Sequence, residues 1–401
     1  KATDKINLAA RENLTGINVV HAFNAEDYQN EKFDKPSKEM FGLQMKNQKA
    51  FALVNPTMTL GMNGLTLVIY WLGAALVNNI PAANVSGRIA FFSEVLAFLT
   101  YATYIVMSFM MLVMIFMMLP QAQVSAERIN EVLSTEPSIK GGSVDKSAEE
   151  GTVEFRNVSF RYKGSPEDEL SDVNFRVEKG KTLAIIGATG SGKTTLVNLI
   201  PRTYDATQGE VLVDGVNVKE YTEKALLDKI GFVTQKATLF SGTVKDNVFF
   251  GESGAEYNDA DLNESLEVSQ ADEFVDKLPE KSGYKIAQLG RNVSGGQKQR
   301  LSIARALARK PEILVFDDSF SALDYRTDAQ LRKELNEKYE GVTKIIVAQR
   351  VGTIRHADEI LVLERGEIVG RGTHDELMKN CEIYREIAAS QLGSQEEEKR
   401  V

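Results

Sequence analysis

The stretch Gly187-Ala-Thr-Gly-Ser-Gly-Lys-Thr194 decides the fold of this 401-residue chain. It matches the spacing G-x-x-x-x-G-K-[ST], in which glycines let backbone N–H groups curl around phosphate oxygens. The apolar run 182–186 before it is typical of a buried strand, and residues 194–200 after it have the apolar content of a helix. Strand, glycine loop and helix in this order predict an α/β domain that holds nucleotide phosphates at the positive end of a helix dipole.

The same motif predicts how a nucleoside triphosphate is held. Lys193 is expected to reach the β- and γ-phosphates, and Thr194 is expected to place its hydroxyl on Mg²⁺. The residues expected around the phosphates are Gly187, Ala188, Thr189, Gly190, Ser191, Gly192, Lys193, Thr194 and Thr195.

A second motif narrows the class of protein. The turn Val293-Ser294-Gly295-Gly296-Gln297 precedes residues 298–309, which are rich in helix formers, and the apolar strand 313–316 then ends in Asp317. Phosphate loop, SGGQ turn and Asp-terminated strand in this order resemble the ATP-binding cassette (ABC) family of transporters. The resemblance covers residues 151–393 nearly without gaps. It implies an α/β ABC-type nucleotide-binding domain with ATP and Mg²⁺ as cofactors.

The resemblance also implies roles for single residues. Tyr162 stands where the family stacks an aromatic ring on adenine, and Gln235 matches the glutamine between the two subdomains of the cassette. Ser321-Ala-Leu-Asp324 matches the loop that crosses the interface between two cassettes. The implied Mg²⁺ ligands are Thr194, Gln235 and Asp317.

In this family two cassettes meet head to tail, and each ATP lies between the phosphate loop of one and the SGGQ turn of the other. Ser294 and the N–H groups of Gly295 and Gly296 are expected to lie at a helix start, so they can face a γ-phosphate across the interface. One chain therefore supplies half of each site, and a partner chain is expected.

Two residues depart from the family pattern. Asp318 stands where the resemblance implies a catalytic glutamate, and Gln349 stands where it implies a switch histidine. The Asp318 side chain is one methylene shorter, so its carboxylate falls roughly 1 Å short of a glutamate's position. A displacement of this size at a general base can cost about 10²-fold in rate. An amide can donate to a γ-phosphate, but it cannot become a cation or relay a proton.

Both departures together resemble a known subclass, the bacterial heterodimeric multidrug-type exporters, in which one ATP site is degenerate and the other competent. We therefore expect a partner half-transporter with an intact glutamate and histidine, to which this chain supplies its SGGQ turn. Hydrolysis at this chain's own phosphate loop is expected to be weak. Two alternatives stay open: a nucleotide-gated channel or regulatory subunit, in which bound ATP is a signal, and a slow homodimeric exporter.

The N-terminal third predicts a membrane protein. Residues 50–87 contain no charged side chain, and the stretch 91–120 contains only Glu94. Two membrane helices are expected at about 57–77 and 91–118, within a region 51–120, because each stretch is long enough to span a bilayer. Residues 78–87 carry Pro, Gly and Asn turn signals and are expected to form a short outside loop.

Residues 1–50 resemble an intracellular loop of ABC exporters that carries a coupling helix. If so, the two spans are the fifth and sixth of six membrane helices, and the chain lacks the first four. Residues 121–150 are expected to continue the last helix into the cytosol and form a linker, and residues 394–401 to form a charged tail. The expected location is the cell membrane, multi-pass, with the cassette in the cytosol.

Composition fits this reading. The net charge of −9 argues against a nucleic-acid partner, and a single cysteine rules out a disulfide framework. The expected cargo is amphipathic or hydrophobic, but its identity stays open. Glu94 is expected to reach the membrane interface, and the methionines between 107 and 118 are expected either to pack or to contact cargo.

Overall fold

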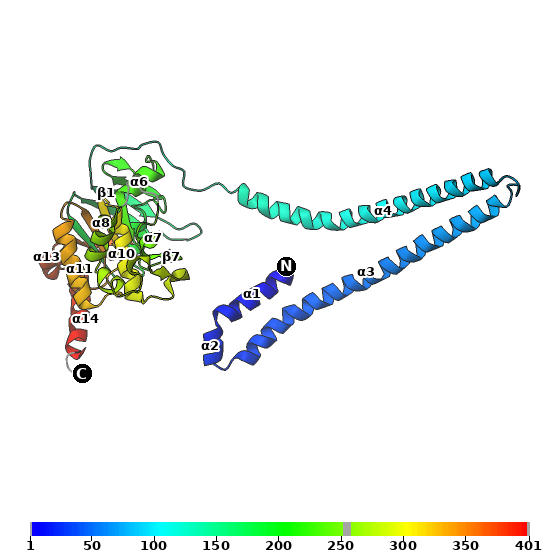
Figure 1. The fold of residues 1–401 in the computed structure, drawn as a ribbon. Coiled ribbons are helices and arrows are strands. Elements are labelled where there is room, and N and C mark those ends of the chain that lie inside the picture. The colour runs from blue at the N-terminus through cyan, green and yellow to red at the C-terminus, as the bar shows by residue number, and fades with distance from the viewer. Residues whose placement is uncertain (1, 252–257, 399–401) are drawn as a thin grey trace. The chain divides into compact units, whose positions relative to one another are not determined.

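The computed structural model describes residues 2–251 and 258–398. The chain divides into two compact units, one that ends at Glu136 and one that begins at Pro137 (Figure 1).

The regular elements in the described part of the first unit are all helices. Its helices are α1 (Ala2–Thr15), α2 (Ile17–Ala22), α3 (Glu26–Val77) and α4 (Val85–Leu133). Helices α3 and α4 form an antiparallel pair that diverges away from its connecting turn, and α1 folds back along the start of α3 (Figure 1). Ion pairs Lys32–Glu12 at 2.7 Å and Lys5–Glu39 at 3.0 Å join α1 to α3.

Within the described residues, α3 and α4 are the two helices long and apolar enough to cross a membrane. The expected spans 57–77 and 91–118 lie inside them, but the helices are much longer. No helix boundary occurs near residue 50, since α3 runs on from Glu26 and carries i,i+4 ion pairs such as Lys35–Glu31 at 3.4 Å. The turn between the helices is shorter than expected, because the Asn84 side chain accepts the Gly87 N–H at 2.9 Å and starts α4 early.

Near this turn the two long helices approach closely. Gly73 of α3 is buried, and a β-carbon there would lie 3.1 Å from both methyl groups of Val95 on α4. A glycine therefore permits the close approach of the two backbones.

The second unit contains a mostly parallel six-stranded sheet among its described residues, ordered β12-β11-β3-β10-β9-β6, with β12 antiparallel at one edge. Its strands are β3 (Thr182–Ile186), β6 (Ile230–Val233), β9 (Ile313–Asp317), β10 (Thr343–Val347), β11 (Glu359–Glu364) and β12 (Glu367–Gly372). The central strands are buried on both faces, as expected for a parallel sheet covered on two sides.

Smaller sheets flank this one. An antiparallel sheet is ordered β2-β1-β4-β5, and β7 pairs with β8. The bounds are β1 (Val153–Phe160), β2 (Leu170–Val177), β4 (Gln208–Val213), β5 (Val216–Asn217), β7 (Gly242–Thr243) and β8 (Lys285–Ile286). Apolar side chains of β1, β2 and β4 share one core with the parallel sheet.

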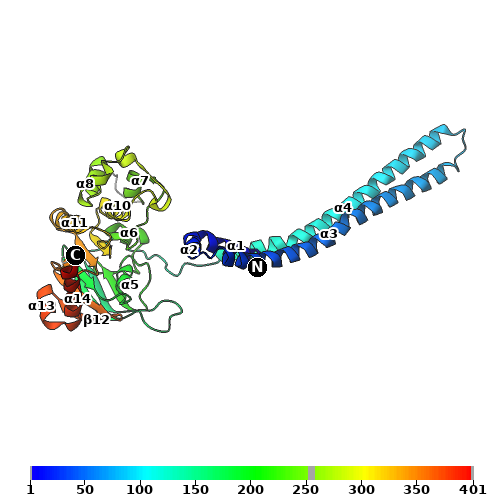
Figure 2. The ribbon, with the colours of Figure 1, turned by 90° about the horizontal axis from the view of Figure 1, so that it is seen from below.

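Three helices of this unit form a group of their own. Helices α7, α8 and α10 gather at one end of the cassette, away from α13 and α14 (Figure 2), around a core of their own. The bounds are α5 (Lys193–Asn198), α6 (Glu223–Lys229), α7 (Val244–Val248), α8 (Asp259–Val268), α9 (Asp272–Val275), α10 (Gly295–Ala308), α11 (Tyr325–Lys338), α12 (Val351–Ile354), α13 (His374–Asn380) and α14 (Glu382–Glu398), with 3₁₀ turns at Lys281–Gly283 and Gln288–Gly290.

The segment before β1 is fixed to this unit. Gly142 N donates to the Tyr221 carbonyl at 2.8 Å, and Val144 pairs with Tyr221 in a parallel bridge. Thr152 N donates to the buried carboxylate of Asp214 at 2.8 Å. The last residues before β1 therefore belong to the second unit.

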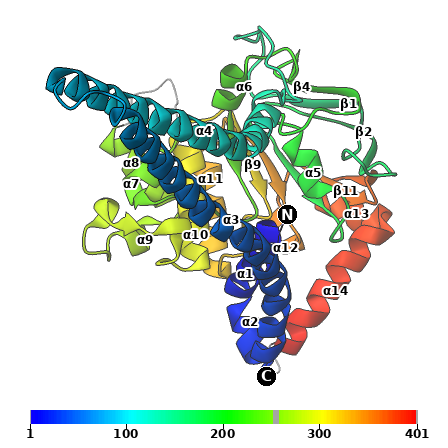
Figure 3. The ribbon, with the colours of Figure 1, turned by 90° about the vertical axis from the view of Figure 1, so that its right-hand side faces the viewer.

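The C-terminal end differs from its prediction. Helix α14 continues to Glu398, so no structural boundary separates the cassette from the expected tail at 394. Residues 399–401 lie outside the described residues. In Figure 3, α14 begins beside α13 and extends away from it.

Candidate nucleotide site

The site lies where three neighbouring parallel strands end. Val347 of β10 pairs with Ile185 of β3 on one side and with Asp317 of β9 on the other. Because carboxyl ends of parallel strands meet at one sheet edge, the residues that follow each strand lie close together. These are the phosphate loop, Asp318 and Gln349, which line one cleft with Gln235.

The phosphate loop is held in a conformation that requires glycine. Gly192 has φ +95°, and a β-carbon there would lie 3.0 Å from the Glu169 carbonyl and 2.9 Å from a Leu170 methyl. Lys193 begins α5, is buried, and donates to the carbonyls of Gly187 and Ala188 at 2.8 and 2.7 Å. Burial lowers the pKa of the Lys193 ammonium.

The three residues expected to bind Mg²⁺, Thr194, Gln235 and Asp317, line the same cleft. Thr194 Oγ1 donates to Asp317 Oδ1 at 3.0 Å. Burial raises the pKa of Asp317, because its carboxylate is taken out of water beside Asp318. The described residues hold no cluster of three His, Cys, Asp or Glu. One carboxylate and one hydroxyl suit Mg²⁺, which usually binds one or two carboxylates together with substrate phosphates.

Asp318, Gln349 and Gln235 form one hydrogen-bonded group. Gln349 Nε2 donates to Asp318 Oδ2 at 2.8 Å, and Gln235 Nε2 donates to the same oxygen at 3.4 Å. Asp318 is 7% exposed, and burial raises its pKa. Its backbone is left-handed, with φ +47°, and the Ser321 hydroxyl donates to its carbonyl at 2.8 Å. The two residues expected to depart from the ABC pattern, Asp318 and Gln349, therefore contact each other directly.

Tyr162 lies beside the helix that follows the phosphate loop. Its hydroxyl is 3.0 Å from Thr195 Oγ1, and its ring meets Phe160 and Tyr204 edge-on at centroid distances of 4.8 and 5.4 Å. The ring is 36% exposed. This position is compatible with a base stacked near the phosphates, and that role stays a prediction.

The SGGQ turn starts a helix earlier than expected, at Gly295 instead of Lys298. Ser294 Oγ accepts from Gln297 N at 3.3 Å, and Gln297 Oε1 accepts from Ser294 N at 2.9 Å, which is a capping box. The N–H groups of Gly295 and Gly296 in the first turn have no acceptor inside the helix. Ser294 uses a lone pair for the cap, so its hydroxyl proton remains able to donate. These residues do not line the cleft around the phosphate loop.

The loop 321–324 connects the site to the next helix. Asp324 caps α11 by accepting from Thr327 N at 3.0 Å and from its hydroxyl at 2.7 Å. A β-carbon on Gly296 would lie 3.4 Å from the Ala322 carbonyl, so this loop also passes close to the SGGQ turn of its own chain. Its expected role at a cassette interface stays a prediction.

The structure adds residues that the motifs did not indicate. Glu169 and Val347 line the cleft, and Gln391 on α14 contacts the backbone on both sides of Arg350. No motif marks Glu169 or Gln391, because both reach the site through the fold, whereas Val347 ends the strand two residues before Gln349.

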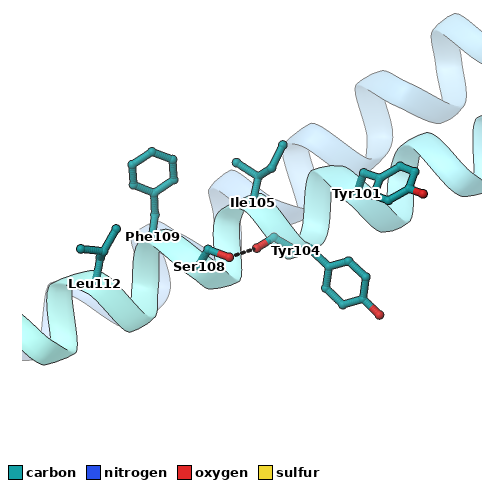
Figure 4. A pocket seen from close by; sticks show the side chains of 6 residues that line it. All are labelled: Tyr101, Tyr104, Ile105, Ser108, Phe109 and Leu112. Atoms are coloured by element: carbon teal, nitrogen blue, oxygen red, sulfur yellow. Dashed lines mark hydrogen bonds between the residues drawn. The ribbon is translucent and has the colours of Figure 1, made fainter.

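The helical unit carries a separate hollow on α4. It is lined by Tyr101, Tyr104, Ile105, Ser108, Phe109 and Leu112 (Figure 4). Ser108 Oγ donates to the Tyr104 carbonyl at 2.8 Å, which leaves the apolar side chains to dominate the lining. None of the methionines between 107 and 118 is among these six residues. Glu94 lines a second, apolar hollow between α3 and α4 with Ile69 and Phe98.

Two sequence profiles match the chain. The profile described as ABC transporter transmembrane region matches residues 1–109, and the profile described as ABC transporter matches residues 170–321. The second match contains the phosphate loop, the SGGQ turn and Asp317.

Similar proteins match nearly the whole chain. An uncharacterized ABC transporter ATP-binding protein of Mycobacterium tuberculosis is 40% identical over 394 residues, covering 97% of this chain and 66% of the relative. An ATP-dependent lipid A-core flippase of Aromatoleum aromaticum is 35% identical over 383 residues, 96% of this chain and 62% of the relative. The chain thus spans about two thirds of the length of these curated relatives.

A solved ABC exporter structure is similar to this chain over nearly its whole length. A bacterial Atm1-family ABC exporter with ATP bound superposes with a TM-score of 0.81 at 27% identity, over 97% of this chain and 68% of that structure.

Proposed function

Because this chain belongs to the ABC transporter family, we propose that it is one subunit of a heterodimeric, ATP-driven exporter. In this proposal its own phosphate loop binds ATP with Mg²⁺ and hydrolyses it weakly. Its SGGQ turn completes a competent site on a partner subunit.

The hydrogen bond between Gln349 and Asp318 carries this proposal. A general base has to accept a proton from water with a free lone pair at the right distance. Asp318 Oδ2 already accepts from two amides, Gln349 at 2.8 Å and Gln235 at 3.4 Å. Neither amide can take up a proton at neutral pH, so neither Gln349 nor Gln235 can relay a proton away from Asp318. Such a site favours holding ATP over cleaving it.

The SGGQ turn supports a role toward a partner. It keeps every feature that a γ-phosphate requires: first-turn N–H groups of α10, a serine hydroxyl with a free proton, and open space at Gly295. No described heavy atom would lie within 4 Å of a β-carbon added to that glycine. The degenerate residues lie only on the phosphate-loop side. The asymmetry between a complete turn and an impaired loop favours two unlike subunits.

The helical unit supports transport across a membrane. Helices α3 and α4 are long enough to cross the bilayer and to extend beyond it, since 52 residues of helix measure about 78 Å. We propose a cell-membrane location with the cassette in the cytosol. The aromatic and aliphatic hollow on α4 suits an amphipathic or hydrophobic cargo, in line with a relative named as a lipid A-core flippase.

The test compares the full-length subunit alone with the subunit joined to its partner. We expect ATP hydrolysis only in the complex. Replacing the partner's catalytic glutamate by glutamine is expected to abolish hydrolysis, and Asp318→Ala in this chain is expected to leave it nearly unchanged. Photo-crosslinking with azido-ATP then identifies what this subunit holds, and we expect uncleaved ATP.

Other results would select the alternatives. Rapid hydrolysis by this subunit alone would mean that Asp318 suffices as a base and that the protein is a homodimeric exporter. Nucleotide binding without substrate-stimulated hydrolysis in the complex would favour a nucleotide-gated channel or regulatory subunit.

A further inference from the structure

The C-terminal helix α14 is anchored to the cassette along one face. Tyr384 is fully buried, and its hydroxyl lies 2.8 Å from His374 Nδ1. Ala388 is also buried, and Ile387 packs against the core of the parallel sheet. The spacing of these residues places Gln391 one turn beyond Ile387 on the same face.

Gln391 holds two backbone groups next to the nucleotide cleft. Its Nε2 donates to the Gln349 carbonyl at 2.6 Å, and its Oε1 accepts from Val351 N at 2.8 Å. Only one orientation of the amide satisfies both contacts, because one partner is an acceptor and the other a donor. The amide therefore bridges both sides of Arg350.

This bridge supplies a cap that the local sequence lacks. Val351 is the first residue of α12, and among the described residues the preceding Arg350 gives this helix no side-chain cap. Instead, the Val351 N–H donates to the side chain of Gln391, which lies 40 residues further along the chain. The segment between β10 and α12 is thereby fixed by α14.

The Gln349 side chain continues the connection into the site. With its carbonyl held by Gln391, its amide Nε2 donates to Asp318 Oδ2 at 2.8 Å. We propose that Gln391 is a positioning residue for this nucleotide site, which holds Gln349 in place and so slows the release of ATP. This inference rests on the proposed function only in treating the site as one that retains ATP.

The experiment measures ATP release from this subunit in the full-length complex. The probe is a fluorescent N-methylanthraniloyl ATP, displaced by excess ATP, with the partner's phosphate-loop lysine replaced so that only this site reports. Gln391→Met keeps the length of the side chain and removes both hydrogen bonds. Gln391→Glu keeps the acceptor for Val351 N. It replaces the donor to the Gln349 carbonyl by a second carboxylate oxygen, so two acceptors would face each other. Glu386→Gln, on an exposed position of the same helix, is the matched control.

We expect Gln391→Met and Gln391→Glu to speed release about fivefold, which corresponds to about 1 kcal/mol, and Glu386→Gln to leave it unchanged. In a Gln349→Ala background, Gln391→Met is expected to have no further effect, because the residue acts through Gln349. Wild-type release in Gln391→Met, or an undiminished effect in the Gln349→Ala background, would overturn the inference. Failure of the proposed function shows separately, as cleavage of ATP at this loop in the wild-type complex.

Discussion

Gln349 and Asp318 are hydrogen-bonded to each other, Nε2 to Oδ2, at 2.8 Å. The two positions that the sequence analysis identified as departures from the ABC pattern are therefore one unit of structure. A change at either residue alters the partner of the other, so their effects on catalysis are not expected to add.

Restoring both residues is expected to restore hydrolysis. In Asp318→Glu combined with Gln349→His, the longer carboxylate moves toward the attacking water and the imidazole can carry charge. We expect the single-turnover rate at this site to rise at least about tenfold, the scale of a repositioned general base. The measurement uses a complex in which the partner's catalytic glutamate is glutamine.

Asp318→Glu alone is expected to give much less. Gln349 remains, and its Nε2, which donates to Asp318 Oδ2 at 2.8 Å, can neither carry charge nor relay a proton. An unchanged rate in the double variant would show that these two residues do not limit the site.

The nucleotide-free subunit is expected to gain stability from Asp318→Asn. Burial raises the pKa of Asp318 in the folded chain. The folded chain therefore binds more protons than the unfolded chain between the two pKa values, and stability falls as pH rises through that window. Asparagine escapes this cost, so we expect a Tm about 2 °C higher at pH 7. The gain should vanish below about pH 3.9, the ordinary pKa of aspartate.

Asp324→Asn is the matched control with the opposite sign. The pKa of Asp324 is lowered mainly by the hydrogen bond from the Thr327 backbone N–H, and further by the one from the Thr327 side chain. Its contribution to stability is present above the unfolded pKa and is lost on acidification. This variant is therefore expected to lose stability at pH 7. Equal shifts of Tm in both variants would contradict the assignment for Asp318.

Ser294→Ala separates a structural role from a role toward the partner. Losing the cap of α10 is expected to cost about 1 kcal/mol of stability. Losing a donor to the γ-phosphate is expected to lower hydrolysis by the complex on the order of 10²-fold. Thr243→Ala removes a similar capping box on α7, where Asp246 N donates to Thr243 Oγ1 at 3.0 Å. We expect a comparable loss of Tm there, with hydrolysis preserved.

Gly192→Ala is expected to weaken ATP binding at least about tenfold, because alanine resists a positive φ and its methyl group meets Glu169 and Leu170. Gly341→Ala is the control, since no described heavy atom lies within 4 Å of the added carbon and its backbone is not in the left-handed region. The affinity of the full-length subunit for ATP, measured by equilibrium binding, compares the two.

The fold class expected from the sequence is confirmed: long membrane-type helices precede an α/β ABC nucleotide-binding domain. The strands were predictable because residues 182–186 and 313–317 are short apolar runs next to glycine or aspartate signals. The phosphate loop could be proposed from the sequence because the nine residues expected around the phosphates, 187–195, are consecutive.

The features that were not predicted are the ends of helices and the contacts between residues far apart in the sequence. The start of α10 at Gly295 follows from the Ser294–Gln297 capping box, a pattern visible in the sequence as S-x-x-Q. The contact of Gln391 with residue 349 joins positions 42 apart and has no local signal. The length of α3 was missed because the expected span rested on the uncharged apolar stretch alone, whereas the helix begins at Glu26 and continues past Pro36 and Pro56.

Residues 142–152 are attached to the nucleotide-binding domain, so they belong in any fragment made to express that domain alone. A fragment that starts at β1 loses the bridge over Tyr221, which is 1% exposed, and the Thr152 N–H bound to Asp214. An aromatic face would be uncovered, and a buried carboxylate would lose a donor worth about 1–3 kcal/mol. We therefore expect a stable fragment of this domain to begin at or before Gly142.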